Sequence, residues 1–226
     1  MKPFEILTTA QLLKKLDSYK YKQLHVHHTW KPDHKNFTGK NHLALQEGMY
    51  NYHTKTNGWG DIGQHVTLMP DGSWVTGRAF NSTPASIKGW NTGAFAVEML
   101  GNFDIGQDKL QGAQKESILE LARYFSKRFG EKSIVFHREG PNVAKTCPGS
   151  GISKADFIKE VRAVGKLYKD VADDRWSIKH LEAADKLNFV NPDAEGNFRP
   201  KDPLTREEAA VIAVRIYEAT TGKKVV

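Results

Sequence analysis

The sequence has very little cysteine and no long apolar segment, and both shortages narrow the class of protein. Its single cysteine, Cys147, excludes an intramolecular disulfide, so this residue is a buried apolar side chain, a nucleophile or a metal ligand. No apolar run approaches the ~20 residues that span a bilayer, so we expect no membrane span. Residues 1–20 also lack the uninterrupted apolar core of a secretory signal.

The remaining composition is that of an ordinary globular protein. Hydrophobic residues make up 39% and charged residues 26% of the 226 positions, which argues against disorder or a fibrous repeat. This length suits one enzyme core, or a core of ~150 residues with a small appendage. We therefore expect the chain to fold unaided, and the pattern of its last part favours the second arrangement.

The net charge of +7 is spread unevenly along the chain. Residues 166–226 contain 11 Lys or Arg and 11 Asp or Glu, so the first 165 residues carry the whole excess. A basic half suits a polyanionic partner such as a cell wall or a nucleic acid, and a solubilising surface explains the charge equally well. Because no recognition helix or stacking motif of aromatic and basic residues is present, we expect no nucleic-acid partner.

Hydrophobic periodicity predicts alternating helices and strands over most of the chain. Helices are expected at residues 8–16, 38–52, 113–129 and 153–164, and strands at 24–29, 65–69, 73–77, 94–100 and 133–136. The turn Pro70-Asp71-Gly72 predicts a hairpin between the second and third strands. Interleaved helices and strands predict an α/β fold with a single mixed central sheet flanked by helices.

The last part of the chain has a different pattern. Two helices are expected at residues 175–187 and 205–219, separated by a turn-rich segment, and Thr205 with Glu208 forms a capping box for the second helix. This pattern predicts a small all-α carboxy-terminal module. We place the domain boundary so that residues 1–165 form one larger domain and residues 166–226 the module.

Three residues combine as a candidate metal site. His27 lies near the end of the first long strand, His137 follows a later strand, and Cys147 lies ten residues further in a loop with glycine and proline. Two imidazoles and a thiolate suit zinc, and a fourth position left for water is typical of a catalytic site. His25, on the same face of the strand as His27, and His28, on the opposite face, are rival ligands, and a chance grouping remains open at this point.

Glu98 is conspicuous for a different reason. It is the one charged residue in the apolar run at 94–100, which reads as a central strand buried on both faces. A buried carboxylate costs free energy unless it has a partner, which favours a working role over a structural one.

Four ordered blocks resemble the N-acetylmuramoyl-L-alanine amidase family, which includes phage amidases and peptidoglycan-recognition proteins. They read VHHTW at 26–30, DIGQHVTLMPDGSWVTGR at 61–78, GWNTGAFAVEMLGNFD at 89–104 and FHREGPNVAKTCPG at 136–149. The resemblance covers residues ~20–165, and several blocks in order are more specific than one motif. It implies hydrolysis of peptidoglycan between N-acetylmuramic acid and L-alanine, with Zn²⁺ held by His27, His137 and Cys147.

The resemblance also assigns roles around the metal. Glu98 matches the acid that many members use as general base, and Lys145 matches the lysine that stabilises the developing oxyanion. The same comparison places four residues beside the substrate, namely Gln64, His65, Trp90 and Asn91. Some phage members have a tyrosine where this chain has Gln64, and glutamine cannot serve as a phenolic acid. For His65 a structural role is an equal alternative.

The tail resembles a single S-layer homology module, from YKDVADDRW through the Gly-x-Phe-x-Pro loop to the Thr-Arg-Glu helix. Such modules bind secondary cell-wall polysaccharide, so the resemblance implies this partner and carries the binding role to Trp176 and Arg206. Trp176 could equally be a core residue.

Other interpretations stay open from the sequence. A zinc peptidase that cuts within the stem peptide is the nearest, and a non-catalytic peptidoglycan receptor is another. Without a secretory signal, we expect a phage endolysin made in the host cytoplasm and released to the cell wall by a holin.

Overall fold

The computed structural model describes residues 3–163, 168, 170–171, 175–187, 189–193 and 195–225. The chain divides into two compact units, Met1–Val161 and Arg162–Val226. The domain boundary expected between residues 165 and 166 lies outside the described residues.

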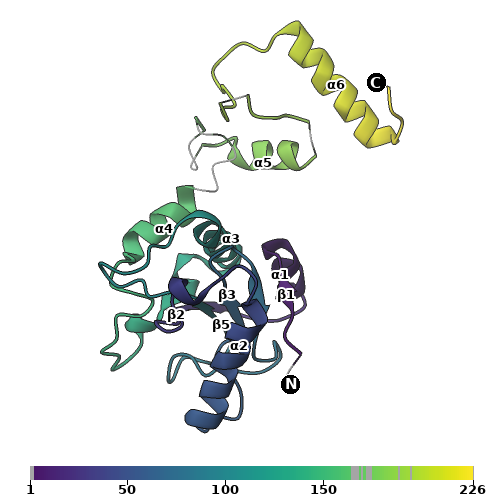
Figure 1. Cartoon of the computed structure of the whole chain (residues 1–226). Coiled ribbons are helices and arrows are strands. Elements are labelled where there is room, and N and C mark those ends of the chain that lie inside the picture. Colours follow the sequence, from purple (N-terminus) through teal and green to yellow (C-terminus); the bar gives the residue numbers. More distant parts are fainter. Residues whose placement is uncertain are drawn as a thin grey trace. The chain divides into compact units, whose positions relative to one another are not determined.

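The first unit is built on one six-stranded mixed sheet, which confirms the predicted fold class (Figure 1). The strands occur in the order β1-β4-β3-β5-β2-β6. Their bounds are β1 Ile6–Leu7, β2 Gln23–His28, β3 Val66–Leu68, β4 Trp74–Thr76, β5 Ala94–Met99 and β6 Ile134–Phe136. The pairs β3/β5, β5/β2 and β2/β6 are parallel, whereas β4 is antiparallel to both β3 and β1.

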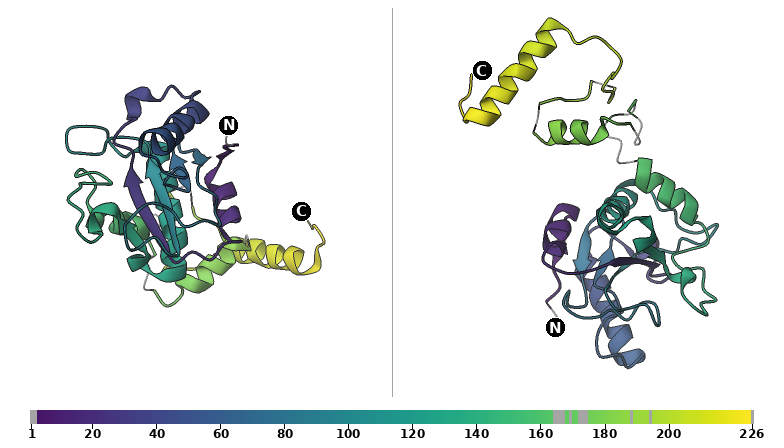
Figure 2. Two further views of the ribbon diagram at one scale, coloured as in Figure 1. Left: turned by 90° about the horizontal axis from the view of Figure 1, so that it is seen from below. Right: turned by 180° about the vertical axis from the view of Figure 1, so that it is seen from behind.

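Four helices of the described residues accompany this sheet, and Figure 2 gives two further views of the ribbon. They are α1 Thr9–Leu16, α2 His42–Asn51, α3 Gly112–Phe129 and α4 Lys154–Ala163. Shorter helical turns occur at Tyr52–Thr56, His34–Asn36, Glu131–Ser133 and His137–Glu139. The capping box of Thr8 and Gln11 begins α1, and Gly130, at a φ of +75°, ends α3.

The main core lies between one face of the sheet and helices α1, α3 and α4. Alternate residues of β2 and β5, such as Leu24, Val26, Phe95 and Val97, are fully buried in this core. Because side chains alternate between the faces of a strand, the residues between them, including His27 and Glu98, point to the opposite face. His25, His27 and Glu98 thereby share the face turned away from the main core, whereas His28 lies on the other face.

Two expectations about local structure need correction. The helix expected from Thr38 begins at His42 instead, because Asn41 holds a preceding turn: its Oδ1 accepts from the Thr38 N–H at 2.9 Å and its Nδ2 donates to the Asn36 oxygen at 2.8 Å. The short edge strand β1 was not expected from the sequence, since two residues are too few to show alternation.

The second unit contains α5, Ile178–Lys186, and α6, Arg206–Thr221. Its small apolar cluster centres on Tyr168, Val171 and Leu181. The predicted capping box is present, with the Thr205 hydroxyl accepting from the Glu208 N–H at 3.1 Å. Among the described residues, no helix is long and apolar enough to cross a membrane.

Candidate metal centre and active site

The three candidate ligands reach one point from three separate segments. His27 lies near the carboxyl end of β2, and His137 follows β6 directly, so the parallel pairing of these strands brings both to the same edge of the sheet. The loop that follows returns Cys147 to this edge. The ligand atoms of the three residues all lie within 4.8 Å of one another.

The donor geometry fits a tetrahedral metal site. The Nδ1 atom of His27 lies 3.6 Å from the sulfur of Cys147. Metal–nitrogen and metal–sulfur distances of about 2.0–2.3 Å with tetrahedral angles would separate these two atoms by roughly 3.5 Å. The rings of His27 and His137 are 4.4 Å apart between centroids. Two imidazoles and one sulfur at such separations form a set that could hold zinc and leave a fourth position open.

The environment of Cys147 favours the neutral thiol in the absence of a bound cation. Its side chain is buried, and burial raises the pKa of the thiol to about 12. The backbone N–H of His28 donates to the sulfur at 3.4 Å, which lowers this pKa in part. A bound dication would lower this pKa and stabilise the thiolate, which is the form of cysteine that binds a metal.

The sequence did not reveal Arg138 as part of this site. Its guanidinium donates to three carbonyl oxygens of the loop that carries Cys147: those of Thr146 at 3.1 Å, Gly149 at 2.9 Å and Ile152 at 2.5 Å. Its backbone N–H donates to the Cys147 oxygen at 2.9 Å. Arg138 therefore fixes the loop against the strand that positions His137. The only sign of this role in the sequence is that Arg138 directly follows His137, a candidate ligand.

Glu98 lies on the strand next to the one that carries His27, one of the candidate metal ligands. In the parallel β2/β5 pair, Glu98 is the register partner of His27, so both side chains point to the same face. Loss of water around the carboxyl raises its pKa to about 7, against the opposing charge of Lys145. Burial lowers the pKa of His137, and the charge of the same lysine lowers it further. A carboxyl with a pKa near neutrality can accept a proton and return it.

The comparisons with known proteins bear on this arrangement. Residues 17–150, more than half of the chain, match the N-acetylmuramoyl-L-alanine amidase family, and residues 167–210 match the S-layer homology domain. The chain belongs to the N-acetylmuramoyl-L-alanine amidase family. It carries a carboxy-terminal S-layer homology domain in addition.

Individual relatives resemble parts of this amidase-family chain. It is 35% identical over 80 residues to an N-acetylmuramoyl-L-alanine amidase of Homo sapiens, a match that covers 35% of this chain and 14% of that protein. It is 33% identical over 61 residues to peptidoglycan-recognition protein SC1a of Drosophila melanogaster, covering 27% of this chain and 33% of the relative. The chain thus spans only a minor part of these relatives.

A solved structure shares the fold. The endolysin N-acetylmuramoyl-L-alanine amidase LysCS from Clostridium intestinale superposes with a TM-score of 0.51 at 23% identity, covering 63% of this chain and 84% of that one. At this identity the likeness concerns the fold alone.

Two residues expected to contact substrate are buried in this amidase-family fold. Both ring nitrogens of His65 bond to backbone: Nδ1 accepts from the Ala96 N–H at 3.0 Å and Nε2 donates to the Ser82 oxygen at 2.9 Å. Gln64 is 2% exposed and donates to the Thr67 hydroxyl at 2.9 Å. For His65 these contacts favour the structural alternative, and neither side chain faces solvent.

Trp90 and Asn91 differ in their surroundings. Trp90 is 39% exposed, so its ring is available to a ligand. The Oδ1 atom of Asn91 instead accepts from the backbone N–H groups of Ser86 and Ile87, at 3.1 and 2.9 Å. Asn91 therefore holds the loop that contains Ser86, a residue the sequence reasoning missed and which contacts two histidines.

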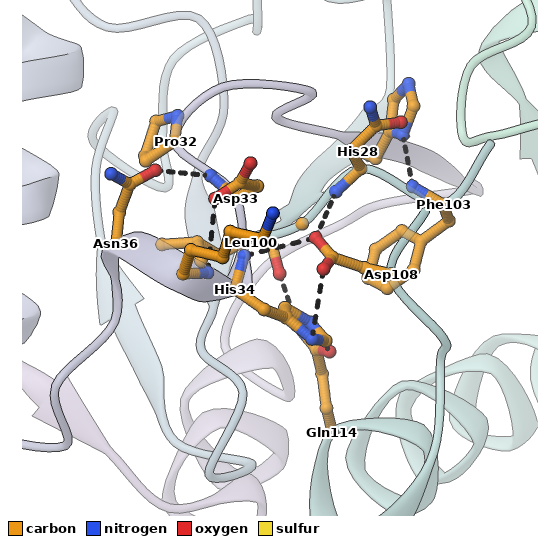
Figure 3. Close-up of polar contacts among 12 residues, drawn as sticks. His28, Pro32, Asp33, His34, Asn36, Leu100, Phe103, Asp108 and Gln114 are labelled. Carbon is orange, nitrogen blue, oxygen red and sulfur yellow. Dashed lines mark hydrogen bonds and ion pairs between the residues drawn. The ribbon is translucent and has the colours of Figure 1, made fainter. Parts of the chain in front are cut away.

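His28, a rival ligand in the sequence, is used elsewhere, as Figure 3 shows. Its Nδ1 accepts from the Phe103 N–H at 3.2 Å. In the same network Asp108 accepts from the His34 N–H at 3.1 Å, and Gln114 contacts the His34 ring at 3.0 Å. His28 thus anchors the loop after β5, on the face of the sheet away from His27.

The candidate wall-binding residues lie in the second unit. Trp176 is 83% exposed, so the structure does not place it in a core. Arg206 is the first residue of α6 and is exposed. Both side chains are accessible to a ligand.

Proposed function

We propose that the protein is a zinc-dependent N-acetylmuramoyl-L-alanine amidase that hydrolyses the amide between N-acetylmuramic acid and L-alanine in peptidoglycan. The observation that carries this proposal is the convergence of His27, His137 and Cys147 within 4.8 Å, with Glu98 in register beside His27. Membership of the amidase family supplies the substrate class.

The residues divide the work of hydrolysis among them. Zinc, when bound by the three ligands, would lower the pKa of a water molecule and polarise the scissile carbonyl. Glu98 accepts the proton of the attacking water as the carbon–oxygen bond forms. It then passes this proton to the leaving nitrogen as the carbon–nitrogen bond breaks. Lys145 stabilises the negative charge that develops on the carbonyl oxygen.

Mass spectrometry of digested cell walls tests this function. An amidase releases free stem peptides that begin with L-alanine and leaves the glycan without peptide. A peptidase would leave L-alanine on the glycan, and a non-catalytic receptor would release nothing, so either result would overturn the proposal. Elemental analysis should give about one zinc per chain in the wild type, with loss of zinc and activity in Cys147→Ser or after chelation.

We further propose that the enzyme is a phage endolysin, made in the host cytoplasm and released to the wall through a holin. The endolysin LysCS, which shares its fold, and the basic catalytic half support this role. Expression with and without a membrane-permeabilising holin tests it. Lysis should require both proteins, and lysis by this protein alone would contradict the proposed route.

We propose that the S-layer homology domain binds secondary cell-wall polysaccharide through Trp176 and Arg206. The family match and the exposure of both side chains support this assignment.

A further inference from the structure

The hydroxyl of Ser86 lies between two histidines of β2. Its Oγ is 2.6 Å from the Nε2 atom of His27 and 3.0 Å from the Nδ1 atom of His25. The Nε2 atom of His25 is in turn 3.1 Å from the Oε1 atom of Gln23. Gln23, His25 and His27 alternate along one strand, so they share a face, and Ser86 joins two of them from a different segment. The four side chains form a continuous chain of hydrogen bonds.

Each bond in this chain has only one consistent direction. The Oε1 atom of Gln23 can only accept, so His25 donates to it from Nε2. A neutral His25 then has no proton on Nδ1, which must accept the proton of the Ser86 hydroxyl. Because the hydroxyl proton of Ser86 is donated in the hydrogen bond to His25, the Oγ atom of Ser86 accepts from the Nε2–H of His27. The acceptor at Gln23 thus sets the direction of the hydrogen bonds through His25 and Ser86 as far as His27.

The last link decides what His27 can do. With its proton on Nε2, the neutral imidazole of His27 presents an unprotonated Nδ1, and this atom faces the Cys147 sulfur at 3.6 Å. A chain running in the opposite direction would leave the proton on Nδ1, where it would block a metal. Metal-binding histidines depend on such outer partners for their tautomer and ring orientation.

The place of Ser86 is itself fixed by backbone contacts. Asn91 accepts from the N–H groups of Ser86 and Ile87, and the Ile87 side chain is buried. His25 is fully buried and His27 is 5% exposed, so little water can replace the serine hydroxyl. The loop therefore delivers the hydroxyl to the two rings in a defined position.

We propose that Ser86, His25 and Gln23 are positioning residues that hold His27 in the tautomer that binds the metal through Nδ1. This inference rests on the proposed function, because it concerns the binding of zinc by His27. None of the three residues has to touch the substrate. Their role differs from that of Glu98 and Lys145, which act on the reacting groups.

The test compares Ser86→Ala and Ser86→Thr with the wild type in the full-length protein. Zinc affinity is measured by competition with a chromophoric chelator, and the protonated nitrogen of His27 is identified by ¹⁵N NMR of the metal-free protein. Ser86→Ala should bind zinc about 10–100-fold more weakly. Its His27 should populate both tautomers. Ser86→Thr keeps the hydroxyl and should restore both properties. Ser82→Ala, an exposed serine of the same loop, is the matched control and should behave as wild type.

A second variant tests the far end of the chain. Gln23→Met keeps the side-chain length and removes the acceptor, so it should weaken zinc binding in the same direction and mix the His27 tautomers. Wild-type zinc affinity in Ser86→Ala, or a proton on Nδ1 of His27 in the wild type, would overturn the inference. An unchanged His27 tautomer in Gln23→Met would show that Gln23 and His25 do not set the tautomer of His27. A wild-type protein that binds no zinc would instead overturn the proposed function.

Discussion

His27 and Glu98 are register partners on the parallel strands β2 and β5, and their side chains share the face of the sheet that is turned away from the main core. Neighbouring strands lie about 4.8 Å apart, so a candidate ligand and a candidate base are neighbours without any contribution from a flexible loop. A site built on strands is held more rigidly than one built on loops alone.

Replacing Glu98 with Gln should abolish most of the turnover while the fold and the metal remain. Gln keeps the size of the side chain but cannot take a proton, so kcat should fall by about 10²–10⁴-fold. Hydrolysis of muropeptides gives kcat, and elemental analysis gives the zinc content. Near-normal turnover in a zinc-loaded Glu98→Gln protein would exclude Glu98 as the base.

Replacing Gly149 with Ala should disturb the loop that carries Cys147. Gly149 has a φ of +123°, and a Cβ added there would lie 2.4 Å from the backbone oxygen of Phe103. Strain and overlap together should destabilise the protein by about 3 kcal/mol and weaken zinc binding. Gly106→Ala is the matched control, since Gly106 has a φ of +83° with open space around it, and should cost about 1 kcal/mol with unchanged zinc affinity. Equal effects of both changes on zinc binding would contradict this view of the loop.

Stability should decrease with falling pH in part because of His65. Burial lowers the pKa of this imidazole from 6.5 to about 4, so the unfolded chain binds more protons than the folded one between these values. The contribution of neutral His65 is present above pH 6.5 and is lost as the pH falls to 4. Denaturant unfolding of metal-free wild type and His65→Phe measures this effect. The difference in their free energies of unfolding should change by about 3 kcal/mol over this range. A constant difference would show that His65 does not titrate in this way.

Deleting residues 166–226 should weaken binding to cell walls and spare hydrolysis of a small soluble substrate. Pelleting with purified walls measures the first property and muropeptide release the second. In the full chain, Trp176→Ala and Arg206→Ala should reproduce the binding loss if these exposed side chains carry it. Unchanged pelleting of the truncated protein would show that the tail is not the anchor.

Much of the fold could be predicted because its signals are local. Alternation of apolar residues indicated β2, a nearly continuous apolar run indicated β5, and Thr205 with Glu208 marked the start of α6. The start of α2 was predicted wrongly, because a competing turn held by Asn41 replaced the expected cap at Thr38. Side-chain hydrogen bonds of this kind depend on rotamers that the sequence does not specify.

The sequence by itself determined which reactive groups the candidate site contains: the imidazoles of His27 and His137, the thiol of Cys147 and a carboxyl in an apolar strand. It also determined that His25 and His27 share one face of their strand and that His28 lies on the other. Only the tertiary structure decided how these groups are used. In the folded chain, the His28 ring accepts a hydrogen bond from the Phe103 N–H, and the Ser86 hydroxyl, 59 positions away in the chain, contacts His27. The reason is that periodicity along a strand fixes where a side chain points, whereas its partner depends on which distant segments the packed core brings together.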